Sequence, residues 1–373
     1  MVIDMNLEEV LKKYYGYEEF RGPQKEVIEA ILAKRDTLTI LPTGMGKSLI
    51  YQIPGILLPG LVVVVSPLIS LMKDQVLNLN KLGLKAKYIT SELSFTEIND
   101  IYRHQERYKF LYVSAERLEN LLFLEHIKEV SLLVVDEAHT IKWGADFRKS
   151  LYHIKAYIAK LKQRPVVACF TATLNKRDIN LVIDKAGLIN PLVTNYLPLK
   201  DNINFVVYKN YKKYHLNKLL NKHLKTIVYS LTRYKTERLY EEYSNRDDVY
   251  IYHGGLDPKT KNSNYLGFKN SKSGVIFATN AFGMGIDIPD IRQVVLYDLP
   301  QNMSDLIQQA GRAGRDLLPC CCYILFSNDS LDVSLKFIYN SSLIKQGKKD
   351  LDEVVKFCFV KDKKEYIRSY FNK

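Results

Sequence analysis

A short segment between an apolar run and a helical pattern carries the residue types that bind phosphate. It reads Leu41-Pro42-Thr43-Gly44-Met45-Gly46-Lys47-Ser48. Its two glycines let backbone N–H groups converge on phosphate oxygens, and the next helix points its positive end at the same anion. Lys47 is expected to reach the β- and γ-phosphates of a nucleotide, and Ser48 to hold Mg²⁺. An ordinary glycine turn before a helix is the weaker alternative.

An acidic pair follows a second apolar run. Asp136-Glu137-Ala138-His139 comes directly after residues 132–135. Asp136 is expected to position Mg²⁺ through its carboxylate, and Glu137 to orient or deprotonate the attacking water. An acidic helix cap is the plain alternative. A phosphate-binding segment on the same predicted sheet disfavours that alternative.

Alternating strands and helices must position these groups. Residues 7–15 and 24–33 read as helices, and runs that are apolar on both faces read as buried parallel strands. The first series of such runs covers residues 37–41, 61–65, 110–113, 132–135 and 166–170, and the second covers 226–230, 249–252, 275–278, 294–297 and 322–326. The pattern predicts an α/β fold with two parallel sheets, divided by a looser stretch near Pro198.

Length and composition limit the number of domains, the kind of partner and the location that the chain can have. The 373 residues suffice for two or three domains, and a net charge of +13 suits a polyanionic partner, although that signal is weak alone. No apolar run approaches the roughly 20 residues that a membrane helix needs, and residues 1–10 lack a signal-peptide pattern, so the default location is cytoplasmic. The five cysteines are odd in number and include the adjacent Cys320, Cys321 and Cys322, which favours buried free thiols over disulfides or a metal pair.

The two motifs, in this form and order, resemble those of superfamily 2 helicases, and further motifs resemble the RecQ family. The resemblance spans residues 7–329. It is carried by Tyr15-Gly16-Tyr17 with Phe20, Arg21 and Gln24, by residues 65–75 and 112–118, by Trp143-Gly144-Ala145-Asp146-Phe147-Arg148, by Thr171-Ala172-Thr173, by Arg233, and by residues 278–287 and 308–316. It implies two RecA-like parallel-sheet domains that use ATP and Mg²⁺.

The resemblance also implies roles for single residues. Tyr17 is expected to stack on adenine while Arg21 and Gln24 read its edge, and Arg312 and Arg315 are expected to reach the γ-phosphate. The expected nucleotide-binding set is Tyr17, Arg21, Gln24, Thr43, Gly44, Met45, Gly46, Lys47, Ser48 and Asp287. The expected nucleic-acid contacts are Ser66, Pro67, Lys73, Gln75, Trp143, Phe147, Arg148, Arg233 and Thr279.

Three features leave alternatives open. Trp143, the only tryptophan, is either an exposed base-stacking residue or a core residue, and its polar neighbours favour the first. The lysines and tyrosines of residues 208–225 form either a nucleic-acid groove or, with greater weight, a solvated helix face. His253 before Gly254-Gly255 either contacts a phosphate backbone or serves as a turn residue.

The expected domains are residues 1–197 for ATP binding, 198–340 for the second helicase domain, and 341–373 for a helical, Lys-rich remnant of the family's zinc-binding region. Because Cys358 alone cannot build a four-ligand site, no zinc is expected. Two departures from the family pattern stand out. Leu317 replaces a usual glycine after Arg315-Asp316, and Asn202 stands near a usual arginine; neither is expected to touch the central chemistry.

The sequence therefore predicts an ATP-dependent DNA helicase or translocase that moves 3′ to 5′ on single-stranded or forked DNA, in recombination or repair. If the source is a bacterium, the expected location is the nucleoid-associated cytoplasm. Three alternatives stay open: an RNA helicase, a DNA-dependent ATPase that unwinds poorly alone, and a non-enzymatic DNA-binding scaffold. The intact Lys47, Asp136, Glu137 and Arg315 disfavour the scaffold.

Overall fold

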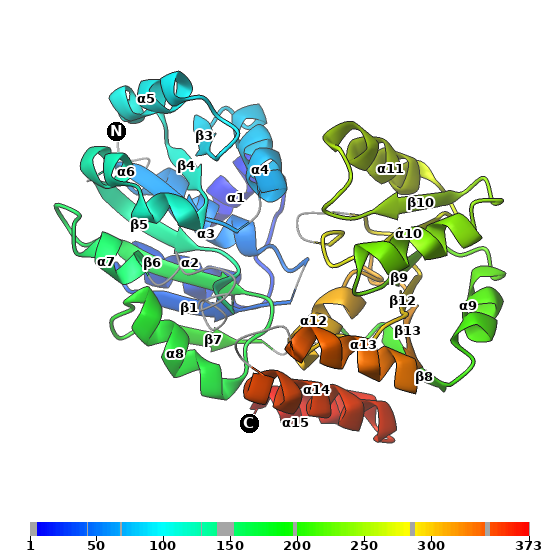
Figure 1. Cartoon of the computed structure of the whole chain (residues 1–373). Helices are drawn as coiled ribbons and strands as arrows, with labels where there is room; N and C mark the ends of the chain where they lie inside the picture. Colours follow the sequence, from blue (N-terminus) through cyan, green and yellow to red (C-terminus); the bar gives the residue numbers. More distant parts are fainter. Residues whose placement is uncertain are drawn as a thin grey trace. The chain divides into compact units, whose positions relative to one another are not determined.

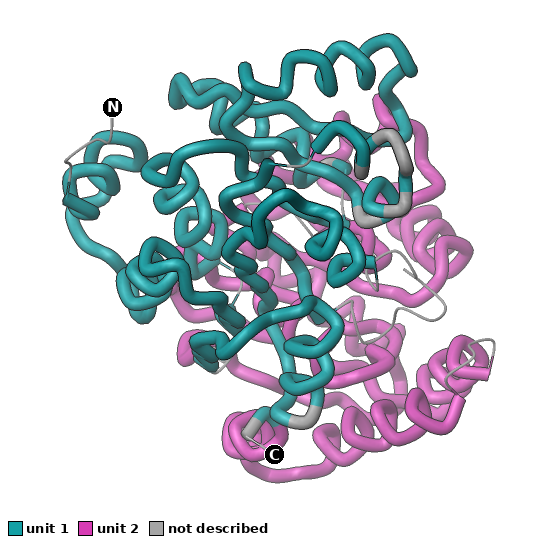
Figure 2. The backbone as a smooth tube through the Cα atoms, turned by 90° about the vertical axis from the view of Figure 1, so that its left-hand side faces the viewer, with its two compact units in different colours: residues 1–198, 371–373 teal, residues 199–370 magenta. Residues whose placement is uncertain are grey.

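The computed structural model describes residues 6–42, 44–67, 69–127, 129–139, 153–196, 200–283, 288–339 and 344–372. The chain divides into two compact units (Figure 2). Unit 1 comprises Met1–Pro198 with Phe371–Lys373, and unit 2 comprises Leu199–Tyr370. Each unit is built on its own parallel sheet with helices packed against it, as Figure 1 shows.

Within its described residues, unit 1 contains a seven-stranded parallel sheet in the order β3-β4-β2-β5-β6-β1-β7. Its strands are β1 (Thr37–Ile40), β2 (Leu61–Val65), β3 (Ala86–Ile89), β4 (Phe110–Val113), β5 (Val130–Val135), β6 (Val166–Thr171) and β7 (Leu192–Asn195). Because all pairs are parallel, the carboxyl ends of these strands meet at one edge. Ligands of open parallel sheets bind at this edge.

Helices cover both faces of the first sheet. The α-helices are α1 (Leu7–Tyr15), α2 (Gln24–Leu32), α3 (Lys47–Leu57), α4 (Ile69–Lys81), α5 (Phe95–Arg103), α6 (Leu121–His126), α7 (Ile154–Ile158) and α8 (Lys176–Ala186), with short 3₁₀ turns η1 (Gln105–Arg107) and η2 (Ala115–Glu119). Alternate strand residues enter two cores. Val62 and Val64 of β2 join the core of α1 to α4, whereas Val63 and Val65 join the core of α5 to α8. This double burial explains the runs that are apolar on both faces.

Unit 2 repeats the architecture with a six-stranded parallel sheet in the order β10-β11-β9-β12-β13-β8 among its described residues. Its strands are β8 (Ile203–Lys209), β9 (Thr226–Tyr229), β10 (Val249–Tyr252), β11 (Val275–Ala278), β12 (Gln293–Leu296) and β13 (Cys320–Phe326). Its helices are α9 (Lys212–Leu220), α10 (Arg233–Glu242), α11 (Pro258–Asn270), α12 (Met303–Ala310), α13 (Asn328–Tyr339), α14 (Ile344–Phe359) and α15 (Lys363–Asn372). Leucines of α9 and α10 pack with β9, β11 and β13 in one core.

The C-terminal helices are part of the packing of unit 2. Phe357 of α14 is fully buried and meets Phe205 of β8 edge-on, with ring centroids 5.6 Å apart. Lys363 caps α14, because its Nζ donates to the carbonyl oxygens of Phe357, Cys358 and Val360. Lys363 of this Lys-rich tail therefore stabilises the fold itself.

The predicted α/β class, with two parallel-sheet domains and a helical tail, is confirmed. All five cysteines are free, and four of them are buried. Among the described residues, no group of three or more His, Cys, Asp and Glu side chains is arranged to hold a metal ion. None of the helices in the described part of the chain has the length and apolar character needed to cross a membrane.

Candidate functional site

The phosphate loop joins β1 to α3 at the carboxyl edge of the first sheet. Gly44 and Gly46 both adopt positive φ, at 86° and 72°, which a side chain would strain. Gly46 is the residue before α3, and Lys47 is the first residue of the helix. The Lys47 Nζ donates to the carbonyl oxygen of Leu41 at 3.2 Å, so the side chain lies over its own loop. Thr43, also expected in this site, lies outside the described residues.

Gln24 fixes this loop from the helix before it. The side chain is 4% exposed; its Nε2 donates to the carbonyl oxygen of Met45 at 2.9 Å, and its Oε1 accepts from the backbone N–H of Arg21 at 2.9 Å. Tyr17 is half exposed, and the Arg21 guanidinium carbon lies 5.5 Å from its ring centroid. The structure thus brings these three predicted adenine-contacting residues together beside the phosphate loop. Their roles toward adenine stay predictions.

The acidic pair follows β5 at the same edge, with β6 lying between β5 and β1. Asp136 and Glu137 are both almost fully buried, and Glu137 has a positive φ of 51°. The Asp136 Oδ1 accepts from the backbone N–H of Glu137 at 2.9 Å. Burial and the neighbouring Glu137 charge raise the pKa of Asp136 to about 7, and the nearby Lys47 ammonium opposes that rise. Two adjacent buried carboxyl groups favour a bound cation.

His139 connects the acidic pair to β6. Its Nδ1 lies 3.3 Å from the Glu137 Oε2 and 3.0 Å from the Oγ1 of Thr171. The Thr171 Oγ1 also donates to the carbonyl oxygen of Thr173 at 3.1 Å. These contacts connect Glu137 to the Thr-Ala-Thr segment, which begins at the last residue of β6.

The predicted nucleic-acid contacts of unit 1 have varied surroundings. Ser66 is buried at the end of β2, and Pro67 is half-buried. Lys73 is exposed and ion-paired with Glu92 at 2.5 Å. The side chain of Gln75 is engaged within the protein, since its Oε1 accepts from the Nε2 of Gln52 in α3 at 2.8 Å. Trp143, Phe147 and Arg148 lie outside the described residues.

Arg233 and Thr279 of unit 2 come from neighbouring strand ends. Arg233 begins α10 after β9, and its guanidinium lies so close to Gly254 and Gly255 that a Cβ there would sit 3.3 and 3.1 Å from its nitrogens. Thr279 follows β11 and donates its backbone N–H to the carbonyl oxygen of Tyr252 in β10 at 3.2 Å. Since β10, β11 and β9 are adjacent, these groups share one edge of the second sheet.

His253 serves as a turn residue here. It is 2% exposed, its Nδ1 accepts from the backbone N–H of Gly255 at 3.2 Å, and its Nε2 lies 3.1 Å from the Glu237 carboxylate. Burial lowers the pKa of this imidazole. Burial and the Gly255 hydrogen bond favour the turn residue over the phosphate contact, the two alternatives for this position.

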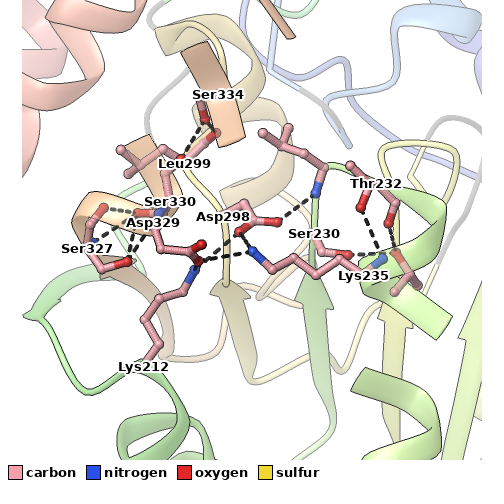
Figure 3. Close-up of polar contacts among 12 residues, drawn as sticks. Lys212, Ser230, Thr232, Lys235, Asp298, Leu299, Ser327, Asp329, Ser330 and Ser334 are labelled. Carbon is pink, nitrogen blue, oxygen red and sulfur yellow. Dashed lines mark hydrogen bonds and ion pairs between the residues drawn. The ribbon is translucent and has the colours of Figure 1, made fainter. Parts of the chain in front are cut away.

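A buried carboxylate holds the start of α10, as Figure 3 shows. The Asp298 side chain after β12 is fully buried; its Oδ1 accepts from Lys212 at 3.2 Å and Lys235 at 2.9 Å, and its Oδ2 from the backbone N–H of Leu231 at 3.1 Å. The contact fixes the segment that leads into Arg233. It also shows that the Lys- and Tyr-rich stretch is not wholly a solvated face, because Lys212 is 8% exposed.

The two candidate arginines lie on the arginine loop, residues 311–318, after α12. Arg312 is 6% exposed, and its Nε would lie 3.2 Å from a Cβ placed on Gly283. Arg315 is partly exposed. Both guanidinium charges lower the pKa of the buried Tyr229, although burial dominates and raises that pKa to about 12. Asp287 lies outside the described residues.

Residues before β8 hold the arginine loop, which the sequence did not indicate. Lys200 donates to the carbonyl oxygen of Gly311 at 3.0 Å, and the Nδ2 of Asn202 donates to those of Gly314 at 2.9 Å and Leu318 at 2.8 Å. Lys200 lay in a stretch that read as a looser connection. Both departures from the family pattern, Asn202 and Leu317, prove to contact or belong to this loop.

Comparison with known protein families defines the class. The family profile of the DEAD/DEAH box helicases matches residues 21–182, and that of the Helicase conserved C-terminal domain matches residues 211–316. Solved structures of similar fold include the MrfA helicase bound to DNA and AMPPNP, with a TM-score of 0.74 and 20% identity over 91% of this chain and 53% of that one. Another is Mss116p bound to single-stranded RNA and AMP-PNP, with a TM-score of 0.73 and 18% identity over 92% of this chain and 76% of that one. The two helicase profiles match one unit each, and these solved helicases share the fold of the chain.

Sequence relatives narrow the class to a family. The chain is 36% identical to ATP-dependent DNA helicase RecQ of Synechocystis, over 86% of this chain and 71% of the relative. It is 37% identical to RecQ of Bacillus subtilis, over 97% of this chain and 64% of the relative. It is 36% identical to the probable ATP-dependent DNA helicase RecS of the same organism, over 94% of this chain and 72% of the relative. The chain belongs to the RecQ family. It spans 64–72% of the length of these three relatives.

Proposed function

We propose that this chain is an ATP-dependent DNA helicase or translocase that moves 3′ to 5′ along single-stranded DNA. The observation that carries the proposal is the meeting of Lys47 with Asp136 and Glu137 at one sheet edge, in a chain of the RecQ family. A cation, a buried acid pair and a glycine-rich loop before a helix form the donor set that phosphoryl transfer needs. The basic net charge of +13 suits a polyanion.

Each residue then has a defined task in ATP hydrolysis. Ser48 and Asp136 would hold Mg²⁺, since oxygen ligands and a buried acid pair fit this ion, and the raised pKa of Asp136 shows that its charge lacks compensation. When bound, Mg²⁺ neutralises phosphate charge. Lys47 binds the phosphates, and Glu137 orients or deprotonates the attacking water. Arg312 and Arg315 stabilise charge that develops on the γ-phosphate.

The nucleic acid is held mainly through its phosphates in this proposal. Arg233 and Thr279 offer a guanidinium and a hydroxyl at one sheet edge, and the glycines at 254 and 255 make room for that guanidinium. Lys73 adds a cation on unit 1. Contacts of this kind carry no base information, so binding should be salt-dependent and largely independent of sequence.

Strand displacement and streptavidin displacement test the proposal together. Short DNA duplexes with a 3′ tail, a 5′ tail or a fork, and their RNA counterparts, are incubated with ATP and Mg²⁺. We expect ATP-dependent separation of 3′-tailed and forked DNA, and faster release of streptavidin from a 5′-biotin than from a 3′-biotin. Activity on RNA alone would establish the RNA helicase alternative. Preference for 5′ tails would refute the direction of movement.

We place the activity in DNA recombination or repair, on the strength of family membership. Cells that lack the gene are then expected to be more sensitive to DNA-damaging agents. Complementation with the Lys47→Ala variant should fail to restore resistance. Full resistance in cells without the gene would contradict this role.

A further inference from the structure

Helix α12 ends at Ala310, directly before the two candidate arginines, and a helix end leaves backbone carbonyl groups without helical partners. Lys200 meets this end. Its Nζ donates to the carbonyl oxygen of Gly311 at 3.0 Å and reaches that of Ala313 at 3.5 Å. A cation at a helix C-terminus is favoured by the helix dipole. Lys200 therefore caps α12 and fixes the backbone on both sides of Arg312.

Asn202 holds the next part of the loop. Its Nδ2 donates to the carbonyl oxygens of Gly314 and Leu318, and Gly314 has a positive φ of 57° that keeps its backbone close to the amide. We call residues 200–202 the brace. Between them, the two side chains hold the backbone before and after Arg315.

The surroundings of Lys200 disfavour the protonated form of its side chain. Burial is the largest effect and the Arg315 charge the next, and with Arg312 they lower the pKa of Lys200 to about 8. Asp316 and Cys320 act in the opposite direction, but burial raises the pKa of the Cys320 thiol to about 11, so that thiol is neutral near pH 8. An ordinary helix cap does not require a lysine beside two arginines. The position of Lys200 points to a role in placing the loop.

We propose that Lys200 is a positioning residue for ATP hydrolysis: its protonated side chain holds the loop of Arg312 and Arg315 in the geometry that the reaction needs. The inference rests on the proposed function, because that function assigns the arginines to the γ-phosphate. Lys200 acts through the loop backbone and needs no contact with the nucleotide. Hydrogen bonds from a charged donor are about twice as strong as neutral ones, so loss of the proton loosens the cap and slows turnover.

Activity and stability should respond to this group in opposite directions as pH rises. The pKa of Lys200 falls from 10.5 to about 8 on folding. Between these two values the unfolded chain binds more protons at this position than the folded chain, so the contribution of Lys200 to stability increases with pH. Turnover falls across the same window. A loss of activity through this group is therefore separable from a loss of fold.

Lys109 provides a matched control in unit 1. Burial lowers its pKa to about 8 as well, and its Nζ donates to the carbonyl oxygens of Leu58 and Gly60, just beyond the end of α3. It thus shares the burial, the shifted pKa and the capping role of Lys200. No candidate arginine follows α3, so its titration should not affect turnover.

The experiment measures kcat of the ATPase at saturating ATP and single-stranded DNA, from about pH 6.5 to about pH 10, a window that contains lysines with lowered pKa values. The variants are Lys200→Arg, Lys200→Met and Lys109→Arg. For the wild type and Lys109→Arg we expect kcat to fall with a midpoint near pH 8. Lys200→Arg should keep its neutral-pH kcat and lose this alkaline fall, since arginine stays charged. Lys200→Met should lower kcat about 10- to 100-fold at neutral pH, with a smaller change in KM.

Each outcome bears on the inference. A wild-type kcat that stays level to about pH 10 would overturn it without any variant. The inference would also be overturned if kcat of Lys200→Arg fell at alkaline pH as it does in the wild type, or if a folded Lys200→Met protein had the wild-type kcat. If Lys200→Met does not fold, the wild type, Lys200→Arg and Lys109→Arg profiles still decide. A wild type without DNA-stimulated ATPase at any pH would refute the proposed function instead.

Discussion

The phosphate loop of unit 1 and the arginine loop of unit 2 hold their charged residues in position through different kinds of contact. In unit 1 the charged groups lie against one another: two buried carboxyl groups are adjacent, and the pKa of Asp136 rises to about 7. In unit 2 neutral carbonyls of the loop are held by Lys200 and Asn202, which lie between the boundary of the two units and β8. Unit 1 therefore contains groups whose charge balance favours a cation, whereas the loop of unit 2 is built from internal contacts. Loss of Lys47 or of a candidate arginine should affect the chemistry directly, whereas changes to Lys200, Asn202 or Gly314 should act through the geometry of the arginine loop.

Lys47→Ala should have the largest effect. ATP hydrolysis is expected to fall below detection, because the cation that binds the phosphates is lost, while DNA binding persists, since Lys47 lies over its own loop. A steady-state ATPase assay with a fluorescence-anisotropy binding assay measures both. Hydrolysis at the wild-type rate would show that the phosphate loop is not the site.

Arg315→Ala should lower kcat about 10³-fold with nearly normal nucleotide affinity, because its charge acts mainly in the transition state. Arg312→Ala tests whether the more buried arginine of the loop also contributes to stability. Arg312 is 6% exposed and lies beside Gly283, so its loss should also lower the melting temperature. Equal losses of stability in both variants, or a change in affinity at unchanged kcat for Arg315→Ala, would contradict these roles.

Gly314→Ala should disrupt the arginine loop. A Cβ there would lie 2.3 Å from the Asn202 Nδ2 and 2.6 Å from the Cys320 Sγ, in addition to the strain of a φ of 57°. We expect a loss of about 2–4 kcal/mol in the free energy of unfolding and a lower kcat. Gly83→Ala is the control, since Gly83 has a φ of 77° but no atom near its Cβ position. It should lose only about 1 kcal/mol, measured by urea unfolding.

Leu317→Gly should have the smallest effect and the opposite sign. Leu317 has a φ of 67° and is 74% exposed, so its side chain adds strain with little packing. Glycine relieves about 1–2 kcal/mol of strain and loses about 0.5–1 kcal/mol to greater unfolded-state entropy. A net gain of about 0.5–1 kcal/mol is expected. Leu318→Gly, next along the chain and outside the positive-φ residues, should destabilise; stabilisation by both changes would point to a cause other than backbone strain.

The sequence predicted the central strands better than the edge strands. Every predicted run lies on a strand, but β3, β7 and β8 were missed, and all three form sheet edges. Edge strands are covered on fewer sides, so their residues alternate between buried and exposed, as in β7 (Leu192–Asn195). The three missed strands lack the continuous apolar run that identified the others, among them the edge strand β10.

In the candidate site, too, the sequence predicted some residues and missed others. Residues of the phosphate loop and acidic pair are close in sequence to the strands that place them, so local pattern located them. Lys200 and Asn202 act on carbonyl groups more than 110 residues away. A contact between a side chain and a distant backbone leaves no spacing in the sequence, which is why the brace was missed. Gln75 is a similar case, because its amide contacts Gln52 of another helix.

Coupling of ATP hydrolysis to DNA is tested by the ATPase rate of the purified chain with no polymer, with single-stranded DNA and with single-stranded RNA. We expect slow hydrolysis without polymer, strong stimulation by DNA, and weaker stimulation by RNA. Stimulation should decline as salt rises, because phosphate contacts release counterions. Hydrolysis that is absent under all three conditions, or that DNA leaves unchanged, would contradict the claim that this chain couples ATP hydrolysis to DNA.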